Sequence, residues 1–292
     1  MKSKKIFPLL GIVALTIALA ILPSGVNAEM YVEGYLGGVS STAAGSKVNF
    51  HSIETIAGIT ATFKGNAPVS GTIDPTIIGG LKLGTWFVKE GVLGRDYPDW
   101  MKYFGCYLDF SIHNMTFNQS NGSWKNFENV FLGMDLRRGG QSFYSPGICY
   151  TLAFMFVARY GLLPDDEVPF GRLQPYIAVG PGIMFANQQP SLTFKTITSL
   201  NGLPGWVYLG KTLNMGSQTS VNVCLAVDAG FRYMMLKKVS LDVSFKYRYA
   251  QPSYEYRNLK IGFPQFGVGS YTFDFSPNLH LFSGQVGVAY HF

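Results

Sequence analysis

The most restrictive feature of this 292-residue sequence is an alternation of apolar and polar residues that recurs in eight segments. The segments cover approximately residues 31–39, 77–87, 103–113, 149–159, 175–185, 221–232, 239–249 and 282–292. Successive side chains of a β-strand point to opposite faces, so this alternation predicts eight strands that each have one apolar face. Most segments are close to the roughly 9–11 residues with which a tilted strand crosses a bilayer.

Charged residues obey the same alternation. One parity carries large apolar residues such as Phe154, Val243 and Val288, and the charged residues of the segments all lie on the other parity. These residues are Glu33, Lys82, Asp109, Arg159, Asp228, Arg232, Asp242, Lys246 and Arg248. Lys102 lies just outside one segment and would break the rule, so we expect it at a rim where its amine reaches water.

Two architectures fit this pattern. In a soluble sandwich or ligand-carrying barrel the apolar face points inward, whereas in a membrane barrel it points outward to lipid. Small residues such as Gly105, Ala178 and Gly180 on the polar parity favour the membrane barrel, because the interior of an eight-stranded barrel is narrow. Short connections also alternate with long ones of about 30 residues, as in outer-membrane barrels. We therefore predict an all-β, eight-stranded antiparallel up-and-down transmembrane barrel with four long extracellular loops and a polar lumen.

The amino terminus predicts export. Basic residues precede an apolar run, and Val26-Asn27-Ala28 supplies the small residues of a cleavage site, so residues 1–28 are predicted to be a signal peptide. The alternative is an uncleaved anchor, but the run is short and contains Pro8. Residues 29–292 then form the barrel domain. Three lysines of the first five residues supply half of the net charge of +6, which leaves too weak a positive charge to indicate nucleic-acid binding.

Several stretches resemble the small outer-membrane β-barrel family that includes the outer-membrane-protein-A-type and opacity-type barrels. They are GGLKLGTWF (79–87), YFGCYLDFSIH (103–113), RLQPYIAVGPGI (172–183), GFRYMMLKKVSLDVSFKYRY (230–249) and the terminal GQVGVAYHF. The resemblance implies a Gram-negative outer-membrane location and contact with outer-membrane lipid and lipopolysaccharide. It also implies that the last strand, with Val286, Val288, Tyr290 and Phe292, is the signal read by the barrel-assembly machinery. A peptidoglycan-binding domain, which some members carry after the barrel, is not expected here.

The lumenal charges leave more than one function open. A polar plug with a structural or surface-interaction role is favoured, and a gated, porin-like small-solute channel is the alternative. Asp109, Ser111 and His113 have the residue types of a hydrolase triad, which raises a lipid A-modifying enzyme as a third hypothesis. Residues two apart on a strand are separated by about 6.6 Å, too far for a direct Ser–His hydrogen bond, so no catalysis is predicted.

The remaining candidates lie in the cysteines and in one connection. Cys106, Cys149 and Cys224 are expected to be free thiols, and no Cys or His pair has metal-ligand spacing, so neither a metal nor a cofactor is predicted. Residues 117–147 place Trp124 near Arg137 and Arg138, a combination that can contact lipopolysaccharide phosphates or a host ligand. An ordinary aromatic girdle with solvated charges is the simpler interpretation of the same residues.

Overall fold

The computed structural model describes residues 30–44, 47–56, 59–69, 71–88, 97–123, 125–129, 139–197, 211–263 and 267–292. The predicted signal peptide, residues 1–28, lies outside these ranges, so its cleavage remains a prediction.

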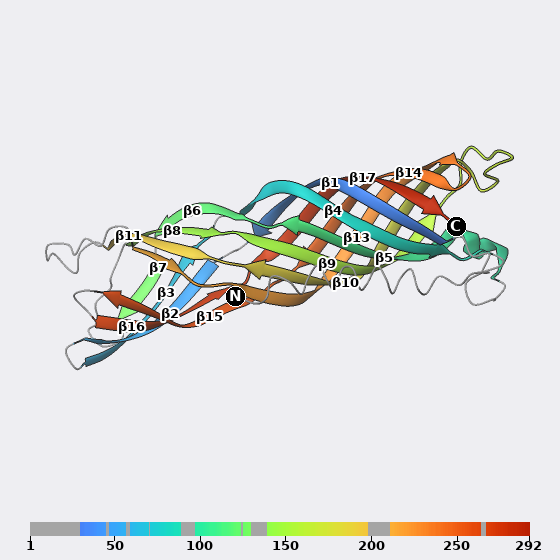
Figure 1. The fold of residues 1–292 in the computed structure, drawn as a ribbon. Coiled ribbons are helices and arrows are strands. Elements are labelled where there is room, and N and C mark those ends of the chain that lie inside the picture. Colours follow the sequence, from blue (N-terminus) through green and yellow to red (C-terminus); the bar gives the residue numbers. More distant parts are fainter. Residues whose placement is uncertain are drawn as a thin grey trace.

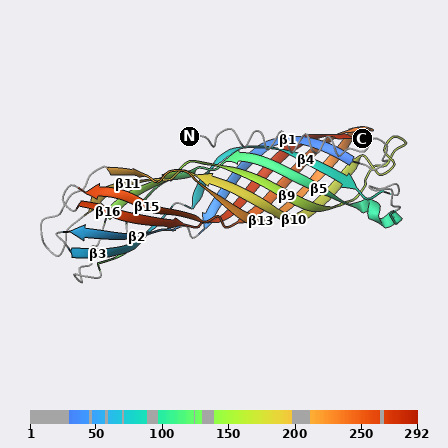
Figure 2. The same ribbon diagram turned by 60° about the horizontal axis from the view of Figure 1, so that its bottom comes forward.

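Eight long strands form a closed antiparallel barrel (Figure 1), which confirms the predicted fold class. They are β1 (Met30–Ala44), β4 (Thr72–Trp86), β5 (Phe104–Asn114), β9 (Gly147–Arg159), β10 (Leu173–Gln188), β13 (Gln218–Leu236), β14 (Val239–Ala250) and β17 (Asn278–His291). Each strand pairs with its neighbours along the chain, and β1 closes the barrel by pairing with both β4 and β17. Figure 2 shows the tilt of the strands across the barrel wall.

The two kinds of connection lie at opposite ends of the barrel. Short links cover residues 87–103, 160–172 and 237–238, and the first of them contains the 3-10 helix η3 (Asp99–Tyr103). Both described chain ends lie at this end, because the His291 amide donates a hydrogen bond of 2.8 Å to the Lys238 carbonyl in the link 237–238, and the Phe292 amide donates one of 3.0 Å to the Met30 carbonyl. Lys102 is exposed in η3, as expected for a rim position.

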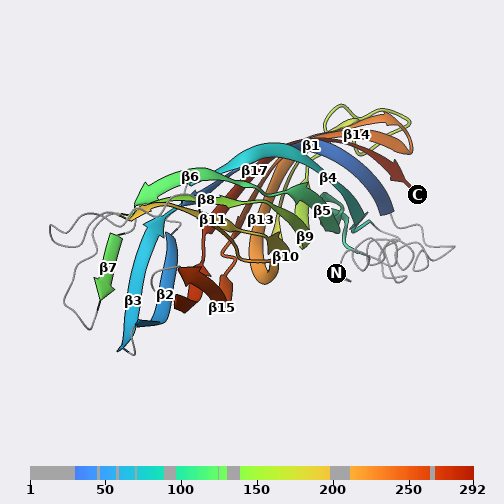
Figure 3. The ribbon, with the colours of Figure 1, turned by 60° about the vertical axis from the view of Figure 1, so that its left-hand side comes forward.

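The four long connections differ from the predicted loops because their described residues form nine further strands. These are β2 (Lys47–Ile56), β3 (Ile59–Pro68), β6 (Phe117–Ser123), β7 (Lys125–Asn129), β8 (Gly139–Ser145), β11 (Ser191–Ile197), β12 (Lys211–Asn214), β15 (Tyr254–Phe263) and β16 (Gly267–Phe275). One group, in the order β6-β8-β11-β12, continues the barrel wall, and a separate sheet has the order β15-β16-β2-β3-β7. Figure 3 shows the two layers beyond the barrel, and we call them the extension.

Proline residues mark the junction between barrel and extension. Pro146 lies between β8 and β9, Pro190 between β10 and β11, Pro252 between β14 and β15, and Pro277 between β16 and β17. Proline has no backbone N–H and therefore cannot continue a ladder of hydrogen bonds. The strands before and after these prolines pair with different neighbours. The chain can therefore form the two layers of the extension beyond a single barrel.

The outer wall of the barrel is apolar, as the alternation predicts. Phe154, Val243 and Val288 are 40%, 49% and 53% exposed, and the other apolar residues of the same parity also face outward. Among the described residues, none of the helices has the length and apolar character needed to span a membrane.

Glycines on the inner face make room for tyrosines of the neighbouring strand. A Cβ atom added at Gly80 would lie 2.3 Å from the Tyr35 hydroxyl oxygen, and one added at Gly84 would lie 2.4 Å from the Tyr31 ring. The tyrosines and glycines are direct cross-strand partners on β1 and β4. The inner face is therefore packed too tightly here for any side chain larger than hydrogen.

Gly80→Val is expected to lower the free energy of unfolding by about 1–3 kcal/mol, because the added methyl groups overpack the lumen and displace Tyr35. Urea unfolding of the detergent-solubilised protein measures this change. Gly38→Val is the matched control, because a Cβ atom at Gly38 meets no heavy atom within 4 Å. Equal stability of the two variants would contradict the tight packing of Tyr35 on Gly80.

Candidate functional site

The structure places all nine charges of the polar parity inside the barrel. Each is at most 4% exposed, a level of burial that charged side chains reach only when they are paired or hydrogen-bonded. They come from β1, β4, β5, β9, β13 and β14, so six of the eight barrel strands contribute. The lumen is therefore the candidate site, and the contacts among these buried side chains determine its chemistry.

Eight of the charges form one continuous chain of ion pairs, which we call the charge network. Four acids, Glu33, Asp109, Asp228 and Asp242, alternate with four bases, Lys82, Arg232, Lys246 and Arg248. Equal numbers of acids and bases give the network no net charge. This balance limits the cost of burying it, because every ion lies next to an opposite charge.

The shortest pairs lie at the two ends of the network. Arg232 and Lys82 hold the Glu33 carboxylate at 2.7 and 2.8 Å. Lys246 and Arg248 approach one carboxylate oxygen of Asp109 at 2.6 and 3.1 Å. Longer pairs connect the ends, since Asp228 lies 3.5 Å from Lys82 and 3.7 Å from Lys246.

Tyrosines complete the coordination of three acids. Tyr35 donates a hydrogen bond of 2.6 Å to Asp109, Tyr107 one of 2.9 Å to Asp228, and Tyr176 one of 2.8 Å to Asp242. Each carboxylate thus has both a charged and a neutral donor. Charge-assisted hydrogen bonds of this kind fix the geometry of both partners.

Arg159 is held differently, near the end of the barrel that carries the short links. Its guanidinium carbon lies 3.8 Å from the ring centroid of Trp86 and 4.2 Å from that of Phe170. It also donates a hydrogen bond of 3.1 Å to the Gln174 side chain. Stacking between two aromatic rings suits the flat, delocalised guanidinium charge.

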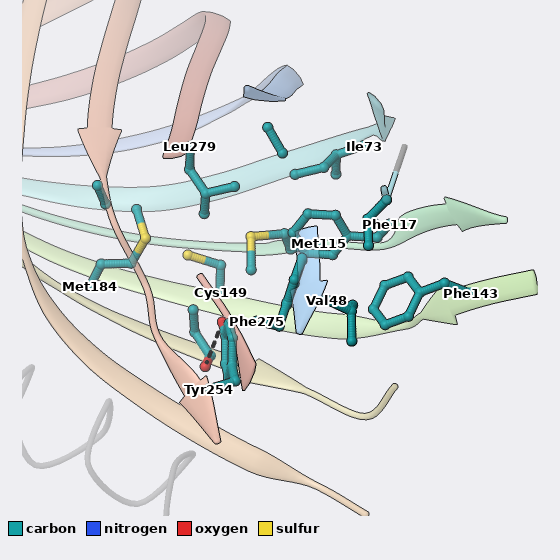
Figure 4. Packing of buried hydrophobic residues seen from close by; sticks show 14 of the residues in the cluster. Val48, Ile73, Met115, Phe117, Phe143, Cys149, Met184, Tyr254, Phe275 and Leu279 are labelled. Carbon is teal, nitrogen blue, oxygen red and sulfur yellow. Dashed lines mark hydrogen bonds between the residues drawn. The ribbon is translucent and has the colours of Figure 1, made fainter. Parts of the chain in front are cut away.

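Beyond the charge network, toward the extension, the lumen is filled by apolar side chains. We call this cluster the apolar plug; Figure 4 shows several of its members. The barrel strands contribute Ile73, Ile78, Cys149, Met184, Ala186, Cys224, Ala250, Leu279 and Leu281, and Met115 follows β5. The extension adds Val48, Phe117, Phe143, Leu192, Tyr254, Tyr256, Tyr271, Phe273 and Phe275. One apolar core therefore runs from the part of the lumen nearest the extension into the space between the two layers of the extension.

Hydrogen bonds attach the extension to the barrel around this plug. Tyr254 and Tyr256 of β15 donate to the backbone carbonyls of Ala186 and Gln188 at 3.2 and 3.4 Å. The buried Gln188 side chain accepts from Ser145 at 2.6 Å and donates to the Met115 carbonyl at 3.0 Å. Both layers are thereby fixed to the end of β10.

A small cavity lies in the part of the lumen that holds the charge network. Tyr31, Trp86, Tyr107, Val157 and Tyr176, with Lys82 and Arg232, line a cavity of about 10 Å³. A cavity of this size holds about one water molecule.

The triad residue types do not form a relay. Asp109 is engaged by two bases, and within the described part of the chain neither the Ser111 hydroxyl nor the His113 ring has a hydrogen-bond partner. Two other histidines gain partners that their sequence positions did not indicate. His280 lies 2.8 Å from the Tyr247 hydroxyl, and His291 lies 2.9 Å from the Ser240 hydroxyl.

The other sequence candidates have different outcomes. Cys106, Cys149 and Cys224 are free; Cys149 and Cys224 are buried inside the barrel, whereas Cys106 is partly exposed. The terminal strand residues Val286, Val288, Tyr290 and Phe292 face outward. Trp124, Arg137 and Arg138 lie outside the described residues, so a surface contact there stays a prediction.

The apolar plug is the part of the lumen that the alternation did not reveal. Its barrel members lie on the lumenal parity, where small and polar residues were expected. A signal was present, because Ile77-Ile78 and Leu281-Phe282 make the strands apolar on both parities near their extension ends. Such a run indicates burial on both sides.

Comparisons with known proteins find similarity of structure only. No family model matches the sequence, and no curated protein matches it. The outer membrane protein OprG from Pseudomonas aeruginosa is 15% identical, with a TM-score of 0.36, and the match covers 92% of this chain and 98% of OprG. Ail, the attachment invasion locus protein of Yersinia pestis, is 13% identical with a TM-score of 0.32, covering 90% of this chain and 99% of Ail.

The outer membrane protease OmpT from Escherichia coli is also similar, at 10% identity and a TM-score of 0.38, covering 92% of this chain and 99% of OmpT. Outer-membrane barrels are thus among the similar structures. At these identities and scores, none of the likenesses assigns a role to this chain.

Proposed function

We propose that this protein is a bacterial outer-membrane β-barrel that carries its extension on the cell surface, in a structural or surface-interaction role. The observation that supports this most is the inverted polarity of the barrel. Phe154, Val243 and Val288 are exposed on the outer wall, while all nine charges of the polar parity are buried within it. Water does not favour such a surface, whereas the hydrocarbon of a bilayer does.

The closed backbone supports the same environment. A lipid-exposed strand must satisfy its N–H and C=O groups internally, which only a closed barrel achieves. The pairing of β1 with both β4 and β17 leaves no open edge in the eight-stranded wall. Both described chain ends lie at the end of the barrel with the short links, so we assign that end to the periplasm and the extension to the outside.

The partners we propose follow from this placement. Outer-membrane lipid and lipopolysaccharide would surround the wall. The barrel-assembly machinery would read the terminal strand, where Val286, Val288, Tyr290 and Phe292 face outward. A host or surface ligand would meet the extension, where the long connections gather. No catalytic role is proposed.

We propose that the lumen does not conduct. The charge network fills one section and the apolar plug fills the next, so a solute would meet two barriers of opposite character. Opening a path would require both separating buried ion pairs and exposing apolar side chains, and each of these is costly.

Purified protein in a planar bilayer is therefore expected to show no steady single-channel conductance in 1 M potassium chloride, a concentration high enough to screen exposed charges (~3 Å Debye length). Insertion must be verified independently, by protease protection and heat-modifiable gel mobility of the same vesicles. Stable, reproducible openings from correctly inserted protein would overturn the sealed lumen and favour the small-solute channel.

A further inference from the structure

Sulfur atoms gather at the boundary between the charge network and the apolar plug. Met115, Cys149 and Met184 are each completely buried inside the barrel. In Figure 4 their side chains lie on the same side of the wall, with the Cys149 thiol between the two thioether groups. Two strand residues, Cys149 of β9 and Met184 of β10, and Met115 just after β5 therefore bring soft ligand atoms to one region of the lumen.

Strand register explains why these residues meet. Cys149 of β9 is the direct partner of His113 on β5, and side chains of direct partners on one face have Cβ atoms about 4.5–5.5 Å apart. Met115 follows His113 by two residues, and its amide donates to the Gly147 carbonyl, so it lies diagonally across from Cys149. On the other side, the partners of Cys149 and Thr151 on β10 are Ala186 and Met184, which places Met184 on the second diagonal.

His113 supplies a fourth ligand type and an unexplained polar group. It is 4% exposed, yet neither ring nitrogen has a hydrogen-bond partner within the described part of the chain. Leaving a buried polar group without a partner costs about 1–3 kcal/mol, so such a ring needs a reason. Nitrogen of this kind is a good ligand for a transition metal once it is neutral.

The donor set selects a particular class of metal. Thiolate and thioether sulfur bind soft ions such as Cu(I), and imidazole also suits copper. Groups of three His, Cys, Asp or Glu side chains that could hold a metal do not occur in the described residues, so this site depends on methionine sulfur.

Charge favours a monovalent ion. Arg248 lies 3.1 Å from Asp109, which shares the lumenal face of β5 with His113 four residues further on, so a fixed positive charge lies beside the site. When a monovalent ion replaces the thiol proton of Cys149, the charge of the region is unchanged. A divalent ion would add a positive charge beside the buried guanidinium, which is unfavourable in a medium of low polarity.

We propose that Cys149, with Met115, Met184 and His113, binds one soft monovalent metal ion of the Cu(I) or Ag(I) class inside the barrel. The metal forms a bond to the Cys149 sulfur as the thiol proton is released to solvent, and no electron is transferred. Because the ligands are buried, we expect the ion to enter while the barrel folds.

The test is refolding of the mature chain into detergent micelles with silver(I) nitrate in chloride-free buffer, followed by removal of loose metal with a thioether chelator. Silver(I) serves as a redox-inert probe. We expect about one retained silver per folded chain, and silver X-ray absorption spectra dominated by sulfur neighbours. Cys149→Ser, or Met115→Leu combined with Met184→Leu, should reduce retention about tenfold or more.

Matched controls separate this site from general thiol binding. Cys106→Ser removes the partly exposed thiol, and Met155→Leu removes a buried methionine in the part of the lumen away from the apolar plug. Neither change should alter the amount of silver retained. Leucine conserves the volume of methionine, so the methionine variants should fold, as heat-modifiable mobility will verify. Retention below one silver in ten chains, or retention that follows Cys106 or Cys224 in place of Cys149, would overturn the proposal. Either failure leaves the outer-membrane assignment unaffected.

Discussion

Asp109→Ala is expected to lower the free energy of unfolding by about 3–5 kcal/mol, because it leaves buried charges without their partner. Lys246 lies 2.6 Å and Arg248 3.1 Å from the same carboxylate oxygen, and both bases are almost completely buried. Tyr35 would also lose the acceptor of its hydrogen bond. Water cannot reach and hydrogen-bond these unpaired side chains unless the lumen opens.

Equilibrium urea unfolding in detergent micelles, followed by heat-modifiable mobility, measures this effect. Asp165→Asn is the matched control, because Asp165 forms an ion pair with Arg172 in the short link 160–172, where solvent screens the charges. The hydrogen bond from Arg172 holds the pKa of Asp165 below its usual value, yet we expect little change in stability on its removal. Similar behaviour of the two variants would show that the charge network is hydrated in solution.

A triple variant that removes Asp109 together with its two basic partners provides a second check. Replacing Lys246 and Arg248 with methionine in the Asp109→Ala background should recover part of the lost stability, because uncharged side chains of similar length need no partner. Failure to recover any stability would indicate that packing around Asp109, and not its charge, determines the loss.

Val179→Arg is expected to lower the free energy of unfolding in phosphatidylcholine vesicles by about 2–4 kcal/mol, the cost of arginine near the bilayer midplane. Val179 lies on β10 with its side chain 50% exposed, between outward-facing residues of both neighbouring strands. A guanidinium at this position would have to remain in hydrocarbon or distort the bilayer to reach water.

The matched control is Asn49→Arg, on the exposed face of β2 in the extension. Its arginine would face water and should leave folding into vesicles unchanged. If Val179→Arg were as harmless as Asn49→Arg, the outer wall of the barrel would not be in contact with lipid.

The barrel itself was predictable because every strand repeats one physical rule. A segment such as 239–249 places apolar side chains on one parity and Asp242, Lys246 and Arg248 on the other, and a period of two leaves only the direction of each face open. The small residues on the polar parity then indicated that this parity faces the lumen and the apolar parity faces lipid. The limits of the strands were less certain, and β13 extends from Gln218 to Leu236 beyond the predicted 221–232.

The extension was missed for a different reason. Its strands are short and variable in pairing, with register shifts such as the one between Tyr256 and Leu259. An alternation was nevertheless visible in Tyr271, Phe273 and Phe275, whose side chains all enter the core. Such short runs specify a strand but not its partner, because sheets form between segments far apart in the chain.

The site was predictable in its residue types but not in its contacts. Parity alone indicates that Asp109 and Arg248 share the lumen, but the side chains come from β5 and β14, on opposite parts of the wall. Sequence spacing does not reveal the grouping of Met115, Cys149 and Met184 for the same reason. His113 and Cys149 become neighbours only through the register of β5 with β9.

The central claim is that the apolar side chains of the barrel face hydrocarbon, and nitroxide accessibility in lipid vesicles tests it most directly. Spin labels would replace Phe154, Val243 and Val288 one at a time in a chain whose three cysteines are changed to serine, with Asn49 labelled as the aqueous reference. We expect oxygen to relax the three barrel labels strongly and a water-soluble nickel chelate to relax only the label at Asn49. Strong relaxation of the barrel labels by the chelate would show that the outer wall meets water, and the membrane assignment would be wrong.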